Sequence, residues 1–237
     1  MKAIIVAGGK GERLRPLTDK VPKPMIKVAG KPVLEHTINL FIEHGVREFI
    51  ISVCYLSKKI VDYFEDGKRF GVEIKYIYED ENIPLGTAGN IASAKKFVDS
   101  DVIVTYADIL RDIDVGEMMR FYKEKDAFGV LNVYKRFGAN PKSKVIFDDK
   151  KQIKEFIERP GHEDILDDFV WCNGSFYIFK PEIFDYLPVN VHADFGKDIF
   201  PMLLYKKKPL YVYQSDGYFI DIGNKEKLEK ARKTFIF

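Results

Sequence analysis

Cysteine and histidine are scarce in this sequence. Its 237 residues include two cysteines, Cys54 and Cys172, and four histidines. The cysteines lie in separate apolar runs with no pair spacing, and no histidines cluster near them, which argues against a disulfide framework and against a Cys/His metal centre. The few histidines also form no Ser/His or Cys/His arrangement typical of covalent catalysis. The sequence therefore does not favour a disulfide-stabilised protein, a Cys/His metalloprotein or an enzyme with a Ser/His or Cys/His catalytic pair.

Long apolar runs and an excess of one charge are also missing. No apolar stretch approaches the roughly 20 residues of a membrane-spanning helix, and the opening MKAIIVAGG is too short for a signal peptide and lacks a cleavage region. The net charge of +2 is spread along the chain without a basic arm, so we expect no nucleic-acid and no membrane partner. The expectation is a cytoplasmic protein that binds a small anion.

The first half of the sequence alternates short apolar runs rich in β-formers with amphipathic segments. This alternation is typical of an α/β fold with a parallel sheet covered on both faces. We expect helices from Pro32 to the residues before Gly45, over 57–66 and from Thr87 to about Phe97. We expect strands over 2–7, 47–54, 72–79 and 101–107.

From about residue 127 the pattern changes to consecutive strand-like runs, which favours a mixed, mainly parallel sheet with antiparallel additions. Strands are expected over 127–135, 144–148, 152–158 and 169–179, and helices over 181–187, 195–206 and from about 224. With no internal repeat or linker, we expect a single domain over 1–237. Residues 160–168 are the best candidate for a mobile loop.

The glycines of AGGKGERLRPLT follow the first strand. A dinucleotide fingerprint would need a glycine where Leu14 stands, and a P-loop would need one at Arg13, so both spacings fail. A glycine loop at the carboxyl end of a parallel strand can still bind an anion through backbone amides. Lys23, between two prolines, supplies a cation on a stiff segment.

The motif Gly8-Gly9-x-Gly11-x-Arg13-Leu14-x-Pro16-Leu17-Thr18, followed by Lys23-Pro24, closely resembles the signature of sugar-1-phosphate nucleotidylyltransferases. The resemblance covers almost the whole chain. It implies a Rossmann-like three-layer fold of the nucleotide-diphospho-sugar transferase type. It also implies an EC 2.7.7 enzyme that joins a nucleoside triphosphate to a sugar 1-phosphate, giving a nucleotide-sugar and pyrophosphate.

The resemblance assigns residues to a nucleotide site, mainly within 1–126. Arg13 and Lys23 would act in catalysis together with Asp108. PLGTAGN matches the family segment beside the base and ribose, and Thr87 there is also a candidate N-cap. The residues that would contact the nucleotide are Ala7, Gly8, Gly9, Gly11, Arg13, Lys23, Gly86, Thr87 and Ala88.

In the family, the positions of Asp108 and Asp221 hold Mg²⁺, the expected cofactor. Asp221 lies in the apolar run GYFIDIG, where a buried carboxylate needs a cation or hydrogen-bond donors. For each aspartate alone, a salt bridge or a strand-end cap is the alternative. Mg²⁺ is commonly bound by one or two carboxylates together with substrate phosphates.

The part over 127–237 would mainly bind the sugar phosphate. One departure from the family is Arg159 in place of a lysine, and because arginine binds phosphate as a planar fork, the position of the sugar phosphate is in doubt. The residues that would contact the sugar phosphate are Glu158, Arg159, Asn173, Gly174 and Lys197.

The reaction explains the absence of a histidine base. A phosphate monoester is already an anion near neutral pH, because its second pKa is about 6, so attack on the α-phosphorus needs charge neutralisation rather than proton removal. The PLGTAGN segment favours GTP with mannose- or heptose-1-phosphate. UTP, dTTP or CTP, a glycosyltransferase using nucleotide-sugars, and a non-catalytic regulatory subunit are the alternatives. The oligomeric state, a homo-oligomer included, stays open.

Overall fold

The computed structural model of the protein describes residues 1–138, 140–161 and 168–236. The chain forms two compact units. Unit 1 contains Met1–Pro84, Thr105–Val115 and Gly217–Phe237, and unit 2 contains Leu85–Val104 and Gly116–Asp216. Most of the loop expected over 160–168 lies outside the described residues. The division by role near residue 126 stays a prediction.

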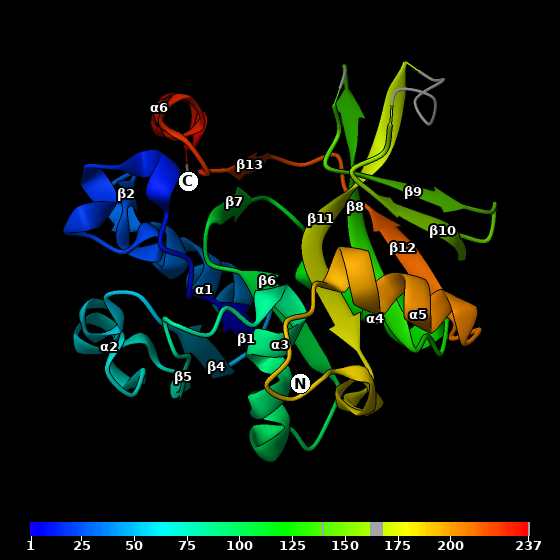
Figure 1. The fold of residues 1–237 in the computed structure, drawn as a ribbon, viewed down its shortest axis with the longest axis horizontal. Coiled ribbons are helices and arrows are strands. Elements are labelled where there is room, and N and C mark those ends of the chain that lie inside the picture. The colour runs from blue at the N-terminus through cyan, green and yellow to red at the C-terminus, as the bar shows by residue number, and fades with distance from the viewer. Residues whose placement is uncertain (139, 162–167, 237) are drawn as a thin grey trace. The chain divides into compact units, whose positions relative to one another are not determined.

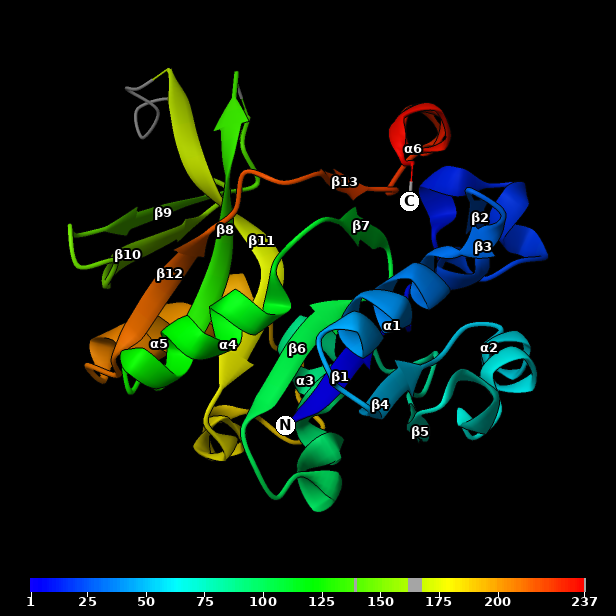
Figure 2. The same cartoon turned by 180° about the vertical axis from the view of Figure 1, so that it is seen from behind.

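Three parallel strands form the centre of unit 1 (Figure 1). Strand β1 (Lys2–Val6) pairs with β4 (Glu48–Val53), which pairs with β5 (Glu73–Tyr78). The apolar residues of β1 and β4 are almost fully buried, as expected for strands covered on both faces, whereas β5 alternates between buried and exposed residues. Helix α1 (Val33–Glu43) lies along these strands (Figure 2). Its Phe41 ring is edge-on to Phe49 of β4. Helix α2 (Ser57–Phe64) follows β4.

A smaller cluster of elements in unit 1 surrounds the residues after β1. Strand β7 (Ile109–Arg111) pairs antiparallel with β13 (Phe219–Asp221), and β2 (Lys27–Val28) pairs with β3 (Lys31–Pro32). Helix α6 (Lys225–Thr234) follows β13. One apolar core joins these elements, which fixes the loop after β1 against the last helix. Its members include Leu14, Ile26, Val33, Leu110, Ile220, Ile222, Leu228 and Phe235.

Unit 2 is built on two long strands and a shorter one. Strand β8 (Gly129–Phe137) pairs antiparallel with β11 (Phe169–Phe179) and parallel with β12 (Leu210–Gln214). Strands β9 (Ser143–Phe147) and β10 (Ile153–Glu158) form a hairpin. Strand β6 (Val102–Tyr106) contributes residues to both units. The helices are α3 (Gly86–Ala92), α4 (Val115–Glu124) and α5 (Phe200–Tyr205).

The architecture confirms the expected α/β fold with a mixed sheet of mostly parallel strands. The expected strands form, with ends shifted by one or two residues. Three helices differ from expectation. The one from Thr87 continues as a 3-10 helix over Ser93–Phe97, and 181–187 is a 3-10 helix over Pro181–Tyr186. The helix expected over 195–206 is a π-helix over Phe195–Ile199 followed by α5. Strands β2, β3, β7, β12 and β13 were not expected. In the described residues, no helix is long and apolar enough to cross a membrane.

Candidate active site

The glycine loop leaves the sheet directly after β1. The Ala7 N–H still donates to the Ser52 carbonyl at 2.8 Å. Beyond it, the N–H groups of residues 8–11 have no hydrogen-bond acceptor among the described residues. Gly11 has a left-handed backbone with φ of 65°, and its carbonyl accepts from the Thr18 hydroxyl at 2.9 Å. The loop is therefore held open with a run of amide donors available to an anion.

Lys23 lies beside this loop and is 8% exposed. It begins the 3-10 turn Lys23–Met25, between Pro22 and Pro24. Its ammonium forms an ion pair with the Asp108 carboxylate and lies 3.6 Å from Asp221 Oδ1. A buried ammonium between two carboxylates is paired rather than isolated, which limits its desolvation cost.

The pairing of β7 with β13 explains how two aspartates so far apart in the sequence meet. Asp221 stands opposite Ile109, the residue after Asp108. The Ile222 N–H donates to the Asp108 carbonyl at 3.0 Å. Both aspartates therefore lie at the end of one short two-stranded ladder, with Lys23 between their side chains.

Arg13, at the end of the glycine loop, lies near Asp221. It lies on the 3-10 turn Glu12–Leu14, which Leu14 anchors in the core with no exposed surface. A Cβ atom built at Gly223 would lie 3.1 Å from an Arg13 guanidinium nitrogen and 2.9 Å from Asp221 Oδ1. A glycine at 223 thus leaves room for this arginine beside this aspartate.

The sequence did not single out Gly223 or Lys227. The Lys227 ammonium on α6 lies 3.6 Å from Asp221 Oδ2. Nothing in the sequence distinguishes it from the other lysines of that helix, because its role depends on where α6 packs. Unit 1 does bring together the residues that the resemblance assigned to its part of the site: Ala7, Gly8, Gly9, Gly11, Arg13, Lys23, Asp108 and Asp221.

The two aspartates fit a magnesium ion by the chemistry of their donors. Both carboxylates converge on one ammonium, so the space between them already suits a positive charge. Carboxylate oxygens are hard ligands, and phosphate oxygens of a substrate would complete the shell of Mg²⁺. No group of three or more His, Cys, Asp or Glu side chains that could hold a metal occurs among the described residues.

The PLGTAGN segment lies in unit 2, where its backbone is tied to residues 193–195. The Thr87 N–H and hydroxyl donate to Asp194 Oδ1 at 2.9 and 3.0 Å. The Ala88 N–H donates to the Ala193 carbonyl at 2.8 Å. A Cβ atom at Gly86, whose φ is +71°, would lie 2.5 Å from that carbonyl, so only glycine allows this approach.

Thr87 is not the N-cap that the sequence suggested. Helix α3 begins one residue earlier, at Gly86, and its N-cap is Leu85, without a side-chain hydrogen bond. The Thr87 hydroxyl instead donates to Asp194 and accepts from the Phe195 N–H at 3.0 Å. The Thr87 hydroxyl therefore binds a residue 107 positions further along the chain and does not cap helix α3.

Glu158, Arg159 and Lys197 belong to neighbouring segments of unit 2. Glu158 ends β10, and its carboxylate lies where a side chain at Gly196 would be. Partial burial raises the pKa of Glu158, and the Asp194 charge raises it further, while Arg159 and Lys142 lower it. Gly196 and Lys197 lie in a π-helical turn over Phe195–Ile199. Such turns are frequent at functional sites.

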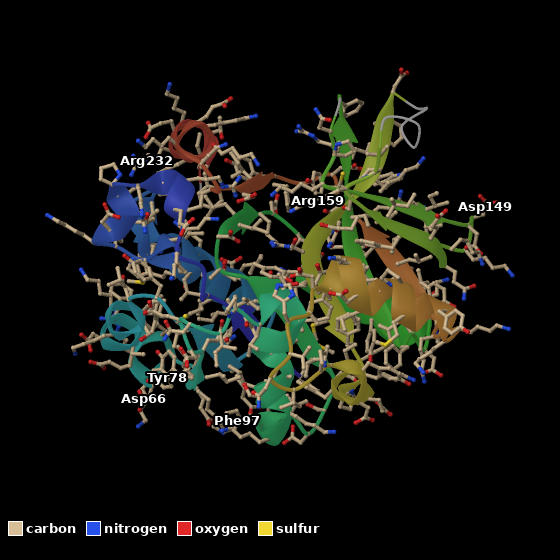
Figure 3. All side chains as sticks on the ribbon, in the orientation of Figure 1. Asp66, Tyr78, Phe97, Asp149, Arg159 and Arg232 are labelled. Atoms are coloured by element: carbon tan, nitrogen blue, oxygen red, sulfur yellow. The ribbon has the colours of Figure 1, made fainter. Side chains whose placement is uncertain are left out.

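Arg159, labelled in Figure 3, has a left-handed backbone with φ of 53°. Its N–H donates to the Lys142 carbonyl at 3.0 Å. A non-glycine residue in this conformation costs of order 1–3 kcal/mol, and such strain clusters at functional sites. Nine other described non-glycine residues also have a positive φ, so the conformation does not distinguish Arg159, and its role stays a prediction.

Asn173 and Gly174 have partners inside unit 2. The Asn173 side chain donates to the Tyr177 hydroxyl at 2.8 Å and accepts from the Ser175 N–H at 2.9 Å. A Cβ atom at Gly174 would collide with the Asn132 side chain. Both residues thus shape an irregularity in β11, where the register shifts between Asn173 and Tyr177. Their assignment to the sugar phosphate stays a prediction.

Comparison with known proteins identifies the family. The model of the family described as nucleotidyl transferase matches residues 2–236.

This chain belongs to the nucleotidyl transferase family.

Curated relatives of this nucleotidyl transferase carry two different activities in their names. A UTP–glucose-1-phosphate uridylyltransferase of Synechocystis is 35% identical over 240 residues, covering 94% of this chain and 60% of the relative. A mannose-1-phosphate guanylyltransferase catalytic subunit beta of Xenopus tropicalis is 33% identical over 228 residues, covering 94% and 61%. The chain thus spans about three-fifths of the length of these relatives.

Solved structures agree with this assignment. HddC from Yersinia pseudotuberculosis, complexed with GMP-PN, is 25% identical with a TM-score of 0.81, covering 99% of each chain. A Bacillus anthracis structure described as a putative glucose-1-phosphate thymidylyltransferase has a TM-score of 0.85 at 20% identity, covering 100% of this chain and 97% of that one. The second likeness establishes the fold of this nucleotidyl transferase.

We expect Asp194→Ala to lower the free energy of unfolding by about 1–2 kcal/mol, because two donors of Thr87 lose their acceptor. Urea unfolding followed by circular dichroism measures the change. Asp185→Ala is the matched control: this aspartate forms an exposed ion pair with Lys95 in the same unit, worth about 0–1 kcal/mol. Equal losses in the two variants would contradict an anchoring role for Asp194.

Proposed function

We propose that this chain transfers a nucleotidyl group from a nucleoside triphosphate to a sugar 1-phosphate, with release of pyrophosphate. The observation that carries the proposal is the run of unpaired amides over residues 8–11, with Arg13 and the Lys23–Asp108–Asp221 cluster beside it. Amide donors and two cations suit a polyphosphate, and the carboxylates suit the magnesium that accompanies one. Family membership supports the same activity.

In the proposed reaction, the protein must reduce the repulsion between two anionic substrates. A sugar-phosphate oxygen forms a bond to the α-phosphorus while the bond to the bridging oxygen breaks, and pyrophosphate leaves in line with the attack. Both reactants are anions, so their repulsion is the main barrier that the protein must reduce. Arg13 and Lys23 neutralise charge at the triphosphate, and the amides of Gly8 to Gly11 orient it. No residue has to remove a proton from the nucleophile.

Asp108 and Asp221 would hold Mg²⁺ in this proposal. When bound, the ion supplies positive charge to the phosphate oxygens and restrains their geometry. Lys23 is the protein's own cation at this place and keeps the two carboxylates from repelling each other. Lys227 adds positive charge on the far oxygen of Asp221.

The sugar phosphate is assigned to unit 2 in this proposal. Arg159 and Lys197 would supply cations to its phosphate, and Glu158 would accept hydrogen bonds from sugar hydroxyl groups. The raised pKa of Glu158 agrees with a carboxylate that is partly removed from water and ready to accept donors. Asp194 would position these groups through the backbone around Lys197.

We further propose GTP and mannose- or heptose-1-phosphate as the substrates. Support comes from the guanylyltransferase names among the relatives and from the HddC complex with GMP-PN. The uridylyltransferase name of the Synechocystis relative keeps UTP as the first alternative. The test is a grid of GTP, UTP, dTTP, CTP and ATP against several sugar 1-phosphates, with pyrophosphate release as the readout. Release from no pair would refute the transferase.

Removal of charge from the cluster in unit 1 should slow turnover without unfolding the protein. We expect Lys23→Ala and Asp108→Asn each to lower kcat by roughly 10²-fold or more, on the scale of deleting one group that stabilises transition-state charge. Steady-state kinetics with the best substrate pair measures the loss. Lys20→Ala, an exposed lysine of the same stretch, is the control and should be unaffected. Near-normal turnover of either cluster variant would refute its role.

Metal removal gives an independent test of the aspartates. We expect EDTA to abolish pyrophosphate release and added Mg²⁺ to restore it, because two carboxylates and a triphosphate form the expected ligand set. We expect Asp221→Asn to need a higher Mg²⁺ concentration for half-maximal rate than the unsubstituted protein. Full activity in EDTA would contradict the metal site.

A further inference from the structure

Lys227 lies in the first turn of helix α6, beside the carboxylate of Asp221. Asn224 caps this helix, and its side-chain oxygen accepts from the Lys227 N–H at 2.9 Å. The next residue, Leu228, is buried and belongs to the same apolar cluster as Leu14 at the end of the glycine loop. The backbone of Lys227 is therefore placed by capping and packing, and its position does not depend on its own charge.

Lysine is an unfavourable residue type at this place in a helix. The first turn carries partial positive charge, so it is stabilised by carboxylates such as Glu226 and destabilised by cations. The ion pair with Asp221 offsets this local cost for Lys227. A residue that a local rule disfavours, and that lies at a charged cluster, is a candidate for a role in function.

Two lysines share the two carboxylate oxygens of Asp221. Lys23 Nζ lies 3.6 Å from Oδ1, and Lys227 Nζ lies 3.6 Å from Oδ2. The Lys23 side chain is 11% exposed and also pairs with Asp108, whereas the Lys227 side chain is 42% exposed. A separation of 3.6 Å is longer than a hydrogen bond, so the Lys227 ammonium is held at Asp221 by charge attraction without one. Lys227 is thus the cation that can leave Asp221 at the lower cost.

Lys227 would have to leave if Asp221 became a ligand of a divalent ion. Carboxylate oxygens lie about 2.1 Å from bound Mg²⁺, and two cations that close to one carboxylate repel each other. Lys23 is held by Asp108 and by the prolines around it. The Lys227 ammonium is carried on a flexible four-carbon stem that is partly in solvent. It is therefore free to turn to an anion that arrives with the metal.

We infer that Lys227 is an exchangeable cation: it neutralises Asp221 in the free protein and moves to a phosphate oxygen of the triphosphate when Asp221 binds a divalent ion. The inference rests on the proposed function and adds a third phosphate-binding cation to its site. Because Arg13, Lys23 and Lys227 outnumber the two aspartates, the cluster has a surplus of positive charge, which favours an anionic ligand.

Lys227→Ala tests the inference because it should change two affinities in opposite directions. Mn²⁺ shares the preference of Mg²⁺ for carboxylate oxygens, and the paramagnetic resonance signal of the free ion measures its binding. We expect the variant to bind Mn²⁺ about two- to fivefold more tightly, since the competing ammonium is gone. Titration calorimetry with inorganic tripolyphosphate at saturating Mg²⁺ measures phosphate binding. There we expect roughly tenfold weaker binding, since a charge-assisted hydrogen bond is lost.

Lys230→Ala is the matched control, because it removes the same charge from an exposed position further along α6. Both of its affinities should stay within about twofold of those of the unsubstituted protein. A disturbed helix would weaken the binding of both ligands, so the opposite signs exclude a merely structural role for Lys227.

If either affinity of Lys227→Ala does not move in its stated direction, the inference is overturned, while pyrophosphate release from the substrate grid still upholds the transferase. Both shifts in a protein that transfers to no sugar phosphate would support the exchange by Lys227 and refute the proposed function. Inorganic tripolyphosphate keeps the two questions apart, because its binding requires neither a base nor a sugar.

Discussion

The ion-pair cluster of Lys23, Asp108 and Asp221 is the interaction on which the candidate site depends. Each residue comes from a different stretch of the chain, and the largely buried Lys23 and Asp221 could not be buried at acceptable cost without a charged partner. The short β7–β13 ladder holds the aspartates, and the two prolines around Lys23 restrict its backbone. The positions of these three side chains therefore depend on their ion pairs as much as on apolar packing.

The glycine loop beside this cluster has two different features. The amides of residues 8–11 are available to an anion, and Gly8 lies against the carboxylate of Glu79, the residue after β5. The Lys23–Asp108–Asp221 cluster lies at one side of the loop, and Glu79, which is followed by Asp80 and Glu81, lies at the other. A polar ligand with a charged and an uncharged end would therefore bind in one direction only. Orientation, more than affinity, is what an in-line displacement requires.

The sequence predicted the fold class and most elements because hydrophobic periodicity is a local signal. It also indicated the glycine loop and the two aspartates, through the resemblance carried by a specific motif. It missed β7 and β13 because three-residue strands have no periodicity to detect. Gly223 and Lys227 were missed because their positions beside Asp221 come from tertiary packing. Thr87 was misread as a cap because its partner, Asp194, is far along the chain. The metal, the cytoplasmic location and the oligomeric state stay predictions.

The contribution of residues 217–237 to unit 1 has a consequence for the order of events during synthesis. Domains generally fold as the chain emerges from the ribosome, N-terminal parts first. Here the first strands can pair early, yet Asp221 and Lys227 join them only after the ribosome has passed the codons for β13 and α6. In a nascent chain, the glycine loop and Lys23 are therefore made before Asp221, which completes the cluster. Nucleotide binding in the proposed manner becomes possible only near the end of translation of this segment.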